Sequence, residues 1–357
     1  MMEFKKIDLF SPWIVGAVII LFLIMGYIGS LNYRFEDPLD LSVILIVLYS
    51  VAIFIIGAII VKKKVKVKEI ELKQILSEKI VLTIVIIAIG LQCLNLILLG
   101  GIPLFDSVLK SNATTMLWRV SYLLFLPSIN ILIARNYKKR YLILVLIGAL
   151  VYGLNGYRTS VIGVLGSVFI TLYYLKKINR KIGIVFIALI IMGGIAIGYI
   201  ASQSIATQHW MLNPVELIFY RLGFTLEVFE RIIPLGGTTK GHILSMIFSS
   251  GSPRTFVGNY VLGDNVCLTS SIFGPVFLDF GIIGLTVQMI LLGVFLKIMN
   301  KIAKSLKGVG IAIYSIILIH TLIWIETGPT DIMIWIFYLL GIILILLAIK
   351  EKAVSLD

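Results

Sequence analysis

Long runs of apolar residues alternate with short polar stretches along most of this chain. The runs that are long enough to be helices lie at residues 12–31, 41–61, 80–99, 114–134, 141–156, 160–175, 182–201, 272–296, 309–325 and 332–349. A helix that crosses a bilayer needs roughly 20 apolar residues, so these runs predict transmembrane helices. We therefore expect an all-α polytopic membrane protein, with about ten spans in a single integral membrane domain over residues 1–357.

One long polar segment, residues 203–271, separates the first seven apolar runs from the last three. It contains a predicted amphipathic helix that starts at Asn213-Pro214-Val215-Glu216, where Asn is the cap, Pro takes the first helical position and Glu stands three residues past the cap. The helix should stop at Pro234. Arg221 falls on the helix face that we expect to pack toward the bundle, and a charge there needs a partner or a ligand. That face also carries Leu217, Val228 and Ile232.

The composition agrees with a membrane protein. A hydrophobic fraction of 59%, a charged fraction of 14% and a mean hydropathy of +1.07 exclude a soluble globular protein. The net charge of +13 does not indicate nucleic acid, because the basic residues form short blocks between apolar runs. With both termini in the cytoplasm, 23 of the 31 lysines and arginines lie on the inner side. We predict a multi-pass protein of the cell (plasma) membrane, with residues 203–271 outside.

The inner and outer sides differ in the type of basic residue. Inside, arginine accounts for only three of the 23 basic residues, whereas outside it accounts for six of eight. The planar guanidinium suits bidentate binding of phosphate or carboxylate, which lysine cannot provide. The asymmetry therefore favours an anion site on the outer side, the alternative being drift in codon use. The basic segment Lys62–Lys79 is expected to attract anionic membrane lipid at the inner face.

Charged residues within or beside the predicted spans are candidates for a site. Arg158 lies in the tight connection between two short runs, where it lines a cavity and meets an anion, or else extends to the lipid headgroups. Arg119 either binds substrate or pairs with a carboxylate. Asp279, about two turns into its run, is a functional carboxylate or forms a salt bridge to one of those arginines. Arg254, in the large loop, is free to reach across.

The histidines and cysteines indicate no metal site. His320 lies beneath Glu326 in the same run and is expected to bond inside the bundle or to act as a base. No HExxH motif, no Cys/His cluster and no nucleotide-binding loop is present. Cys93 and Cys267 are expected to be unpaired and buried, with a single disulfide as the alternative. The first apolar run lacks a cleavage site, so no signal peptide is predicted.

Three short motifs resemble those of a known group of membrane enzymes. They are GGIPLF at Gly100–Phe105, NGYRTS at Asn155–Ser160 and TSSIFGPVFLDFGIIG at Thr269–Gly284. With the apolar runs and one large outer loop, they resemble the Wzy-type O-antigen polymerases and their archaeal relatives, which join oligosaccharide repeat units. The related O-antigen ligases usually carry a histidine near the end of the large loop. Here that region holds Asn259, Asp264 and Asn265 instead.

The resemblance implies a glycosyltransferase that works on the outer face without a cofactor. Its donor would be a growing glycan on a polyprenyl phosphate or diphosphate, and its acceptor a single lipid-linked repeat unit. A glycan flippase or a chain-length regulator is a candidate protein partner. We predict Arg158, Arg254 and Asp279 as catalytic residues, with Asp279 as the first candidate base. Substrate binding is assigned to Arg119, Arg221, His320 and Glu326, the last two also being alternative bases.

Two other classes of function remain open besides a ligase. A transporter for lipid-linked oligosaccharide would also need buried arginines to hold phosphate. It predicts repeat symmetry and broken helices in matching halves, which the sequence does not show. The second class, a purely structural membrane subunit, is disfavoured because it would not need arginine and aspartate within the spans.

Overall fold

The computed structural model describes residues 8–32, 34–35, 37–61, 77–178, 180–203, 212–249 and 251–354. Most of the basic segment Lys62–Lys79 lies outside the described residues. Within these ranges the regular secondary structure is helical, which confirms the predicted all-α class. The helices are α1 (Trp13–Ser30), α2 (Leu41–Ile60), α3 (Glu78–Leu98), α4 (Ser107–Asn112), α5 (Met116–Asn136), α6 (Tyr141–Gly153), α7 (Arg158–Tyr174), α8 (Arg180–Gln203), α9 (Pro214–Ile232), α10 (His242–Ile247), α11 (Pro253–Leu262), α12 (Gly274–Leu306), α13 (Gly308–Thr327) and α14 (Ile332–Val354).

The apolar helices agree with the predicted runs to within a few residues at most ends. Seven of the helices in the described ranges are long and apolar enough to cross a membrane, and they are α1, α2, α3, α5, α8, α12 and α13. The apolar parts of α6, α7 and α14 are shorter, so the count of ten spans stays a prediction. The largest difference is at α12, which continues ten residues past the predicted end because its last turns are amphipathic and basic rather than apolar.

The chain forms two compact units. The first unit comprises Met1–Val65, Tyr220–Lys301 and Trp324–Thr330, and the second comprises Lys66–Phe219, Ile302–Ile323 and Asp331–Asp357. Each unit is assembled from three separate stretches of sequence, so the division follows no boundary in the sequence, and the single integral membrane domain stays a prediction. Cys93 and Cys267 are free, as predicted, but both are exposed rather than buried.

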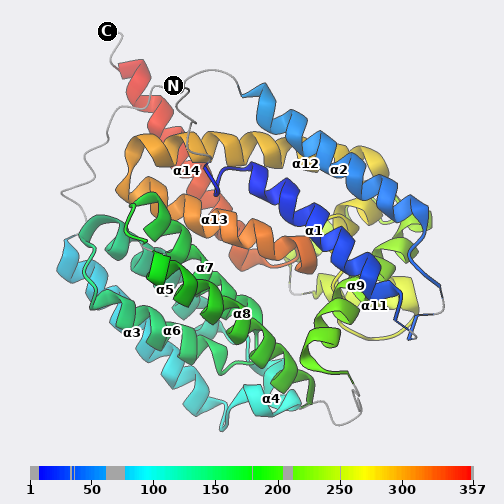
Figure 1. The fold of residues 1–357 in the computed structure, drawn as a ribbon, viewed down its shortest axis with the longest axis horizontal. Helices are drawn as coiled ribbons and strands as arrows, with labels where there is room; N and C mark the ends of the chain where they lie inside the picture. The colour runs from blue at the N-terminus through cyan, green and yellow to red at the C-terminus, as the bar shows by residue number, and fades with distance from the viewer. Residues whose placement is uncertain are drawn as a thin grey trace. The chain divides into compact units, whose positions relative to one another are not determined.

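In the first unit, α2 and α12 are in direct backbone contact. A Cβ atom on Gly57 of α2 would lie 2.5 Å from the carbonyl oxygen of Ile290, and one on Gly293 of α12 would lie 2.3 Å from that of Phe54. These distances leave no room for a side chain, and small residues are what membrane helices use for such close approach. Figure 1 shows α1 and α2 (blue) side by side, with the chain running in opposite directions along the two helices.

The loop helix α9 packs on the C-terminal end of α1. A Cβ atom on Gly223 of α9 would meet the Ser30 nitrogen at 2.9 Å. The segment after α1 adds a second contact, because the Asp40 N–H donates to Oε2 of Glu230 at 3.4 Å. From Tyr220 onward, α9 is therefore packed into the first unit.

In the second unit, α3 and α5 to α8 form a bundle, drawn in cyan and green in Figure 1. Its core is apolar, with Phe125, Ile129 and Val164 fully buried. One polar contact joins α5 to α7: the amide nitrogen of Asn130 donates to Ser167 at 2.9 Å, and its oxygen accepts from Thr171 at 2.8 Å. With all partners satisfied, these buried groups fix the register of the two helices.

Two of the motifs that carried the resemblance pack on each other in this unit. The Leu104 N–H of GGIPLF donates to the Leu154 carbonyl at 2.9 Å, directly before NGYRTS. Gly156 has a φ of 75° and lies so close that a Cβ atom would be 3.3 Å from the Leu104 Cα. Glycine is needed there for the left-handed backbone. The contact fixes the turn that leads into Arg158.

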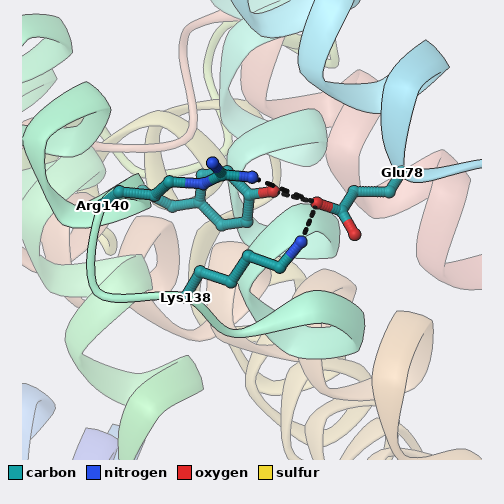
Figure 2. Close-up of polar contacts among 4 residues, drawn as sticks. Glu78, Lys138 and Arg140 are labelled. Carbon is teal, nitrogen blue, oxygen red and sulfur yellow. Dashed lines mark hydrogen bonds and ion pairs between the residues drawn. The ribbon is translucent and has the colours of Figure 1, made fainter.

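A cluster of charges joins the start of α3 to the connection between α5 and α6 (Figure 2). Oε1 of Glu78 accepts from Nζ of Lys138 at 2.5 Å and from the Tyr141 hydroxyl, and Nη2 of Arg140 lies 3.8 Å away. The hydrogen bond to Glu78 raises the pKa of Lys138 above its ordinary value. One carboxylate at the start of α3 thus contacts three side chains of the segment that joins α5 to α6.

Candidate functional site

The helix that carries Arg221 starts where the sequence predicts. Oδ1 of Asn213 accepts from the N–H groups of Val215 at 3.0 Å and Glu216 at 2.9 Å, and the Glu216 carboxylate accepts the Asn213 N–H at 3.0 Å. This reciprocal arrangement is a capping box, which satisfies backbone donors that the helix itself leaves unpaired. It fixes the register of α9 and therefore the position of Arg221.

Arg221 forms an ion pair with Glu326 near the end of α13, with 3.0 Å between Nε and Oε1. The pair supplies the partner that a charge on this face was expected to need, while the Arg221 side chain stays 49% exposed. The long side chain leaves that face and carries its charge to a partner. The same helix carries a second ion pair, between Glu227 and Arg231 at i,i+4 spacing, with 2.7 Å between Oε1 and Nη2.

Arg254 is the second residue of α11, which is capped by Ser252 through its hydroxyl. Nε of Arg254 donates to the Thr330 hydroxyl at 2.9 Å. Its backbone carbonyl accepts the Leu268 N–H at 3.1 Å. Both ends of the residue are therefore fixed.

The partners of the two arginines lie on one short segment. Glu326 and Thr330 stand on either side of a turn at Gly328, whose N–H donates to the Trp324 carbonyl at 2.9 Å and whose φ is 75°. Since four residues span at most about 14 Å of backbone, the two guanidinium groups are bound by side chains of one short segment in the first unit. We call Arg221, Arg254, Glu326 and Thr330 the two-arginine site.

Both arginines are held through Nε. In the part of the chain that the structure describes, no residue accepts a hydrogen bond from Nη1 or Nη2 of either side chain. The two Nη atoms of a guanidinium form the fork that binds phosphate or carboxylate in a bidentate way. Both arginines thus keep their Nη atoms without a hydrogen-bond partner among the described residues.

The segment Leu268–Ile272 ties the two arginines to one support. Leu268 donates its N–H to the carbonyl of Arg254. Thr269 lies 3.3 Å from the Thr225 hydroxyl, oxygen to oxygen, and Thr225 donates to the Arg221 carbonyl at 3.0 Å. The backbones of both arginines are thus linked through neighbouring residues of the third motif.

The same segment contacts the turn that carries Glu326 and Thr330. The Ile272 N–H donates to the Ile325 carbonyl at 3.3 Å. A Cβ atom on Gly328 would lie only 2.7 Å from the Ser271 carbonyl oxygen, and Ser271 itself has a φ of 59°. Gly328 is therefore fixed as glycine both by its backbone conformation and by this close approach.

Asp279 lies beside a break in α12. At Gly281 the backbone has φ 61° and ψ −153°, which is not helical. The loop after α9 fills the break, because Gly237 donates to the Phe277 carbonyl at 3.1 Å and Thr239 donates to that of Leu278 at 3.3 Å. Non-helical backbone within a membrane helix needs such protein partners.

Both oxygens of the Asp279 carboxylate are engaged by the same loop. Oδ1 accepts from the Thr239 hydroxyl at 2.6 Å and the Ile243 N–H at 3.0 Å, and Oδ2 accepts from the Leu244 N–H at 2.8 Å. The side chain is 2% exposed. Three donors from one loop, a hydroxyl and two backbone N–H groups, thus engage this one carboxylate. The geometry assigns Asp279 to holding the loop.

The other predicted site residues belong to the second unit. Arg158 is the first residue of α7 and is half-buried. A Cβ atom on Gly198 of α8 would lie 3.6 Å from its Cδ, so α8 passes beside the Arg158 side chain.

Arg119 lies one turn into α5 and is exposed, and no described residue forms an ion pair with it.

His320 is bonded inside the second unit. Its Nδ1 lies 2.8 Å from the Ile316 carbonyl, and its Nε2 lies 3.2 Å from the Tyr122 hydroxyl. Because a carbonyl can only accept, Nδ1 carries the proton and Nε2 accepts from Tyr122. His320 is 2% exposed, which agrees with the structural interpretation of this residue.

Sequence reasoning missed Thr330, Gly328 and the supporting segment Leu268–Ile272. The available signal was Gly328-Pro329, a turn sequence placed two residues after Glu326. Among the described residues, no group of three or more His, Cys, Asp or Glu side chains could hold a metal ion. The chemistry that the site offers is therefore that of two guanidinium groups and one carboxylate.

The described residues form an all-helical protein with several helices long and apolar enough to cross a membrane, which defines its class as a multi-pass membrane protein. The chain matches the protein family described as "Putative O-antigen polymerase" over residues 8–338, and it therefore belongs to that family. Two relatives come from Methanocaldococcus jannaschii. "Uncharacterized protein MJ0419" is 29% identical over 263 residues, which cover 71% of this chain and 72% of the relative. "Uncharacterized protein MJ0420" is 30% identical over 224 residues, which cover 62% and 55%. No solved structure matches the chain.

Proposed function

We propose that this protein polymerises lipid-linked oligosaccharide repeat units on the outer face of the cell membrane. It would transfer the growing glycan from a polyprenyl phosphate or diphosphate to an acceptor repeat unit. The observation that carries the proposal is the two-arginine site, where Arg221 and Arg254 are each anchored through Nε and offer their Nη atoms. A lipid-borne donor with a phosphate leaving group fits such a site.

The proposed step is a displacement at the anomeric carbon of the donor sugar. The acceptor hydroxyl oxygen forms the new glycosidic bond while the bond from that carbon to the lipid phosphate oxygen breaks, and the phosphate keeps the electron pair. Arg221 and Arg254 stabilise the charge that develops on the departing phosphate, which is worth most where water is excluded. Glu326, the carboxylate within the site, accepts the hydroxyl proton and passes it to water.

The membrane arrangement is part of the proposal. Ten crossings with both termini in the cytoplasm place the two-arginine site on the outer side. The excess of lysine and arginine in the connections on the inner side supports this orientation. A flippase that delivers the substrate to the outer face, or a chain-length regulator, is then the kind of protein partner expected.

Arg158 of the second unit remains a proposed participant. Its position at the start of α7, with one of the family-like motifs packed beneath it, supports a fixed side chain rather than one that extends freely to the headgroups. Lysine at this position keeps the charge but loses the fork. If Arg158→Lys and Arg158→Ala both polymerise at the wild-type rate, Arg158 takes no part in the reaction. Arg119, being exposed, is assigned to substrate contact.

A product analysis separates this proposal from its alternatives. Purified full-length protein is incubated with lipid-linked repeat units, and the products are resolved by size. A ladder of lengths identifies a polymerase, whereas a single transfer to a different lipid identifies a ligase. Movement of the substrate across a vesicle membrane without a new bond identifies a transporter.

A further inference from the structure

The second unit contains a set of buried polar atoms without hydrogen-bond partners among the described residues. They belong to five uncharged side chains that are at most 6% exposed. The atoms are Nε2 of Gln92, Nδ2 of Asn95, Nε1 of Trp118, the hydroxyl of Tyr152, and both Nδ2 and Oδ1 of Asn155. Five of these six atoms carry hydrogens to donate.

Four of the five side chains, from α3, α5 and α6, are linked through neighbouring hydrogen bonds and ring contacts, and Asn155 follows directly after α6, with its N–H donating to the Tyr152 carbonyl at 3.4 Å. The Ser121 hydroxyl donates to Oε1 of Gln92 at 3.4 Å and to the Trp118 carbonyl at 2.9 Å. The Thr115 hydroxyl donates to Oδ1 of Asn95 at 2.5 Å, one turn along α3 from Gln92.

Aromatic rings line the same cluster. Trp118 and Tyr122 are stacked, with 5.4 Å between ring centroids and 7° between planes. Tyr152 meets Tyr122 edge to face at 5.3 Å. Asn155 follows Tyr152 by three residues, at the turn that leads to Arg158. The set is therefore a group of N–H and O–H donors interleaved with aromatic rings, which we call the polar–aromatic cluster.

Leaving these atoms unpaired is costly. An unsatisfied buried donor costs about 1–3 kcal/mol, and native proteins contain few of them. A concentration of such atoms in one place within a membrane bundle indicates an oxygen-rich occupant that accepts their hydrogen bonds. Because the side chains carry no charge, they suit a neutral occupant and not the phosphate.

We propose that the polar–aromatic cluster binds a neutral sugar residue of the lipid-linked glycan. A sugar ring presents hydroxyl oxygens at its edge and C–H groups on its faces, which match amide, indole and phenol donors beside aromatic rings. This inference rests on the proposed function, because it assigns the sugar part of the substrate to the second unit.

The first test uses the stability of two variants. Asn155→Leu replaces an amide whose two polar atoms have no partner with an apolar group of similar size, which costs little in the empty protein. Gln92→Met gives up only the long 3.4 Å contact from the Ser121 hydroxyl, which keeps its hydrogen bond to the Trp118 carbonyl. We expect both variants to keep or raise the melting temperature of the full-length protein. The matched control is Asn130→Leu, which leaves Ser167 and Thr171 unpaired and should lower the melting temperature. A fall for Asn155→Leu equal to that for Asn130→Leu would overturn the proposal.

The second test measures binding directly. The probe is the lipid-free repeat-unit oligosaccharide, released from the lipid-linked substrate by mild acid and titrated into the protein by calorimetry. We expect Asn155→Leu and Gln92→Met to weaken binding about tenfold or more, equivalent to about 1.4 kcal/mol. Arg221→Lys should bind the probe like wild type, because the probe carries no lipid phosphate. Equal affinity of wild type and Asn155→Leu for the probe contradicts the assignment.

The two proposals fail in different ways. If wild-type protein builds a ladder and Asn155→Leu does so with an unchanged KM, the sugar site is wrong while the polymerase stands. If wild-type protein binds the oligosaccharide through Asn155 but forms no new bond, the sugar site stands while the polymerase is wrong.

Discussion

Nε of Arg221 lies 3.0 Å from Oε1 of Glu326, although 105 residues separate them in the chain. The contact joins the amphipathic helix of the large loop to the end of an apolar helix. It also directs the remaining nitrogens of the guanidinium away from the protein's own acceptors. The most informative experiments therefore change one member of this pair or its surroundings.

Replacing Arg221 or Arg254 with lysine should reduce kcat of polymerisation about a hundredfold. The charge remains, but the planar fork that meets the phosphate is lost, and one missing transition-state donor costs about 10²–10³ in kcat. The measurement is the initial rate of ladder formation at saturating substrate. The matched control is Arg231→Lys on the same helix, whose pair with Glu227 is exposed and whose rate should stay within twofold. Equal rates for Arg221→Lys and Arg231→Lys would remove Arg221 from the site.

Gly328→Ala should impair the reaction only by shifting the turn that positions Glu326 and Thr330. The added Cβ meets the Ser271 carbonyl oxygen at 2.7 Å and must displace the turn that holds Glu326 and Thr330. Gly263 has the same φ of 75°, but nothing lies within 4 Å of its Cβ position. Gly263→Ala therefore carries the same backbone strain, about 1 kcal/mol, without the collision.

We expect Gly328→Ala to lower kcat about tenfold relative to Gly263→Ala. The comparison is made at equal amounts of folded protein, by size-exclusion profile and melting temperature. Similar kcat values for the two variants would show that the turn does not position the arginines.

Asp279→Asn should reduce stability more than catalysis. The amide has one acceptor oxygen and introduces two N–H donors where Ile243 and Leu244 already donate. The loss of a buried charge-assisted contact costs about 1–3 kcal/mol. We expect a lower melting temperature, with kcat per folded molecule within a few-fold of wild type. A variant that melts like wild type but forms no polymer would instead identify Asp279 as the base. Thr239→Val, which removes one of the three donors, should shift the melting temperature in the same direction by less.

Glu78→Gln should lower the melting temperature at neutral pH, because it removes the carboxylate that pairs with the charged Lys138 side chain. The pKa of Lys138 is raised by its hydrogen bond to Glu78 above the ordinary 10.5. A raised lysine pKa stabilises the folded state fully below 10.5 and loses this effect as the pH rises through the folded-state value. The difference between Glu78→Gln and wild type should therefore shrink above pH 10.5. A difference that stays constant through that range would mean that packing, and not the charge on Lys138, holds this contact.

Local patterns were sufficient for the helices. The apolar runs specify α1, α2 and α13 to within about two residues, because burial in a bilayer requires a long apolar segment whatever its neighbours are. The capping box at Asn213 was equally readable, since its donors and acceptors lie within three residues. The sequence also shows that some connections between apolar runs are rich in lysine and others in arginine, and the assignment of the two groups to the inner and outer faces stays a prediction.

The roles of the candidate site residues stay predictions, but the structure shows which contacts of these residues the sequence could indicate. The partner that Arg221 needed was expected, but its identity was not, because residues 221 and 326 meet only after the chain has folded. Asp279 was given a base-like role on its position in an apolar run alone. The three groups that donate to its carboxylate come from residues 239–244, some 40 positions earlier in the chain, and no local sequence pattern predicts these hydrogen bonds.

The sequence by itself determined that this is a helical membrane protein with one long polar segment, residues 203–271, between its apolar runs. Only the tertiary structure decided that Arg221 and Arg254 share the short segment from Glu326 to Thr330, that Asp279 holds a loop, and that unpaired polar groups gather around Tyr152. Hydropathy and helix capping act between residues close in sequence. Ion pairs and buried hydrogen bonds are fixed by distances of a few ångströms between residues that are 76 or 105 positions apart.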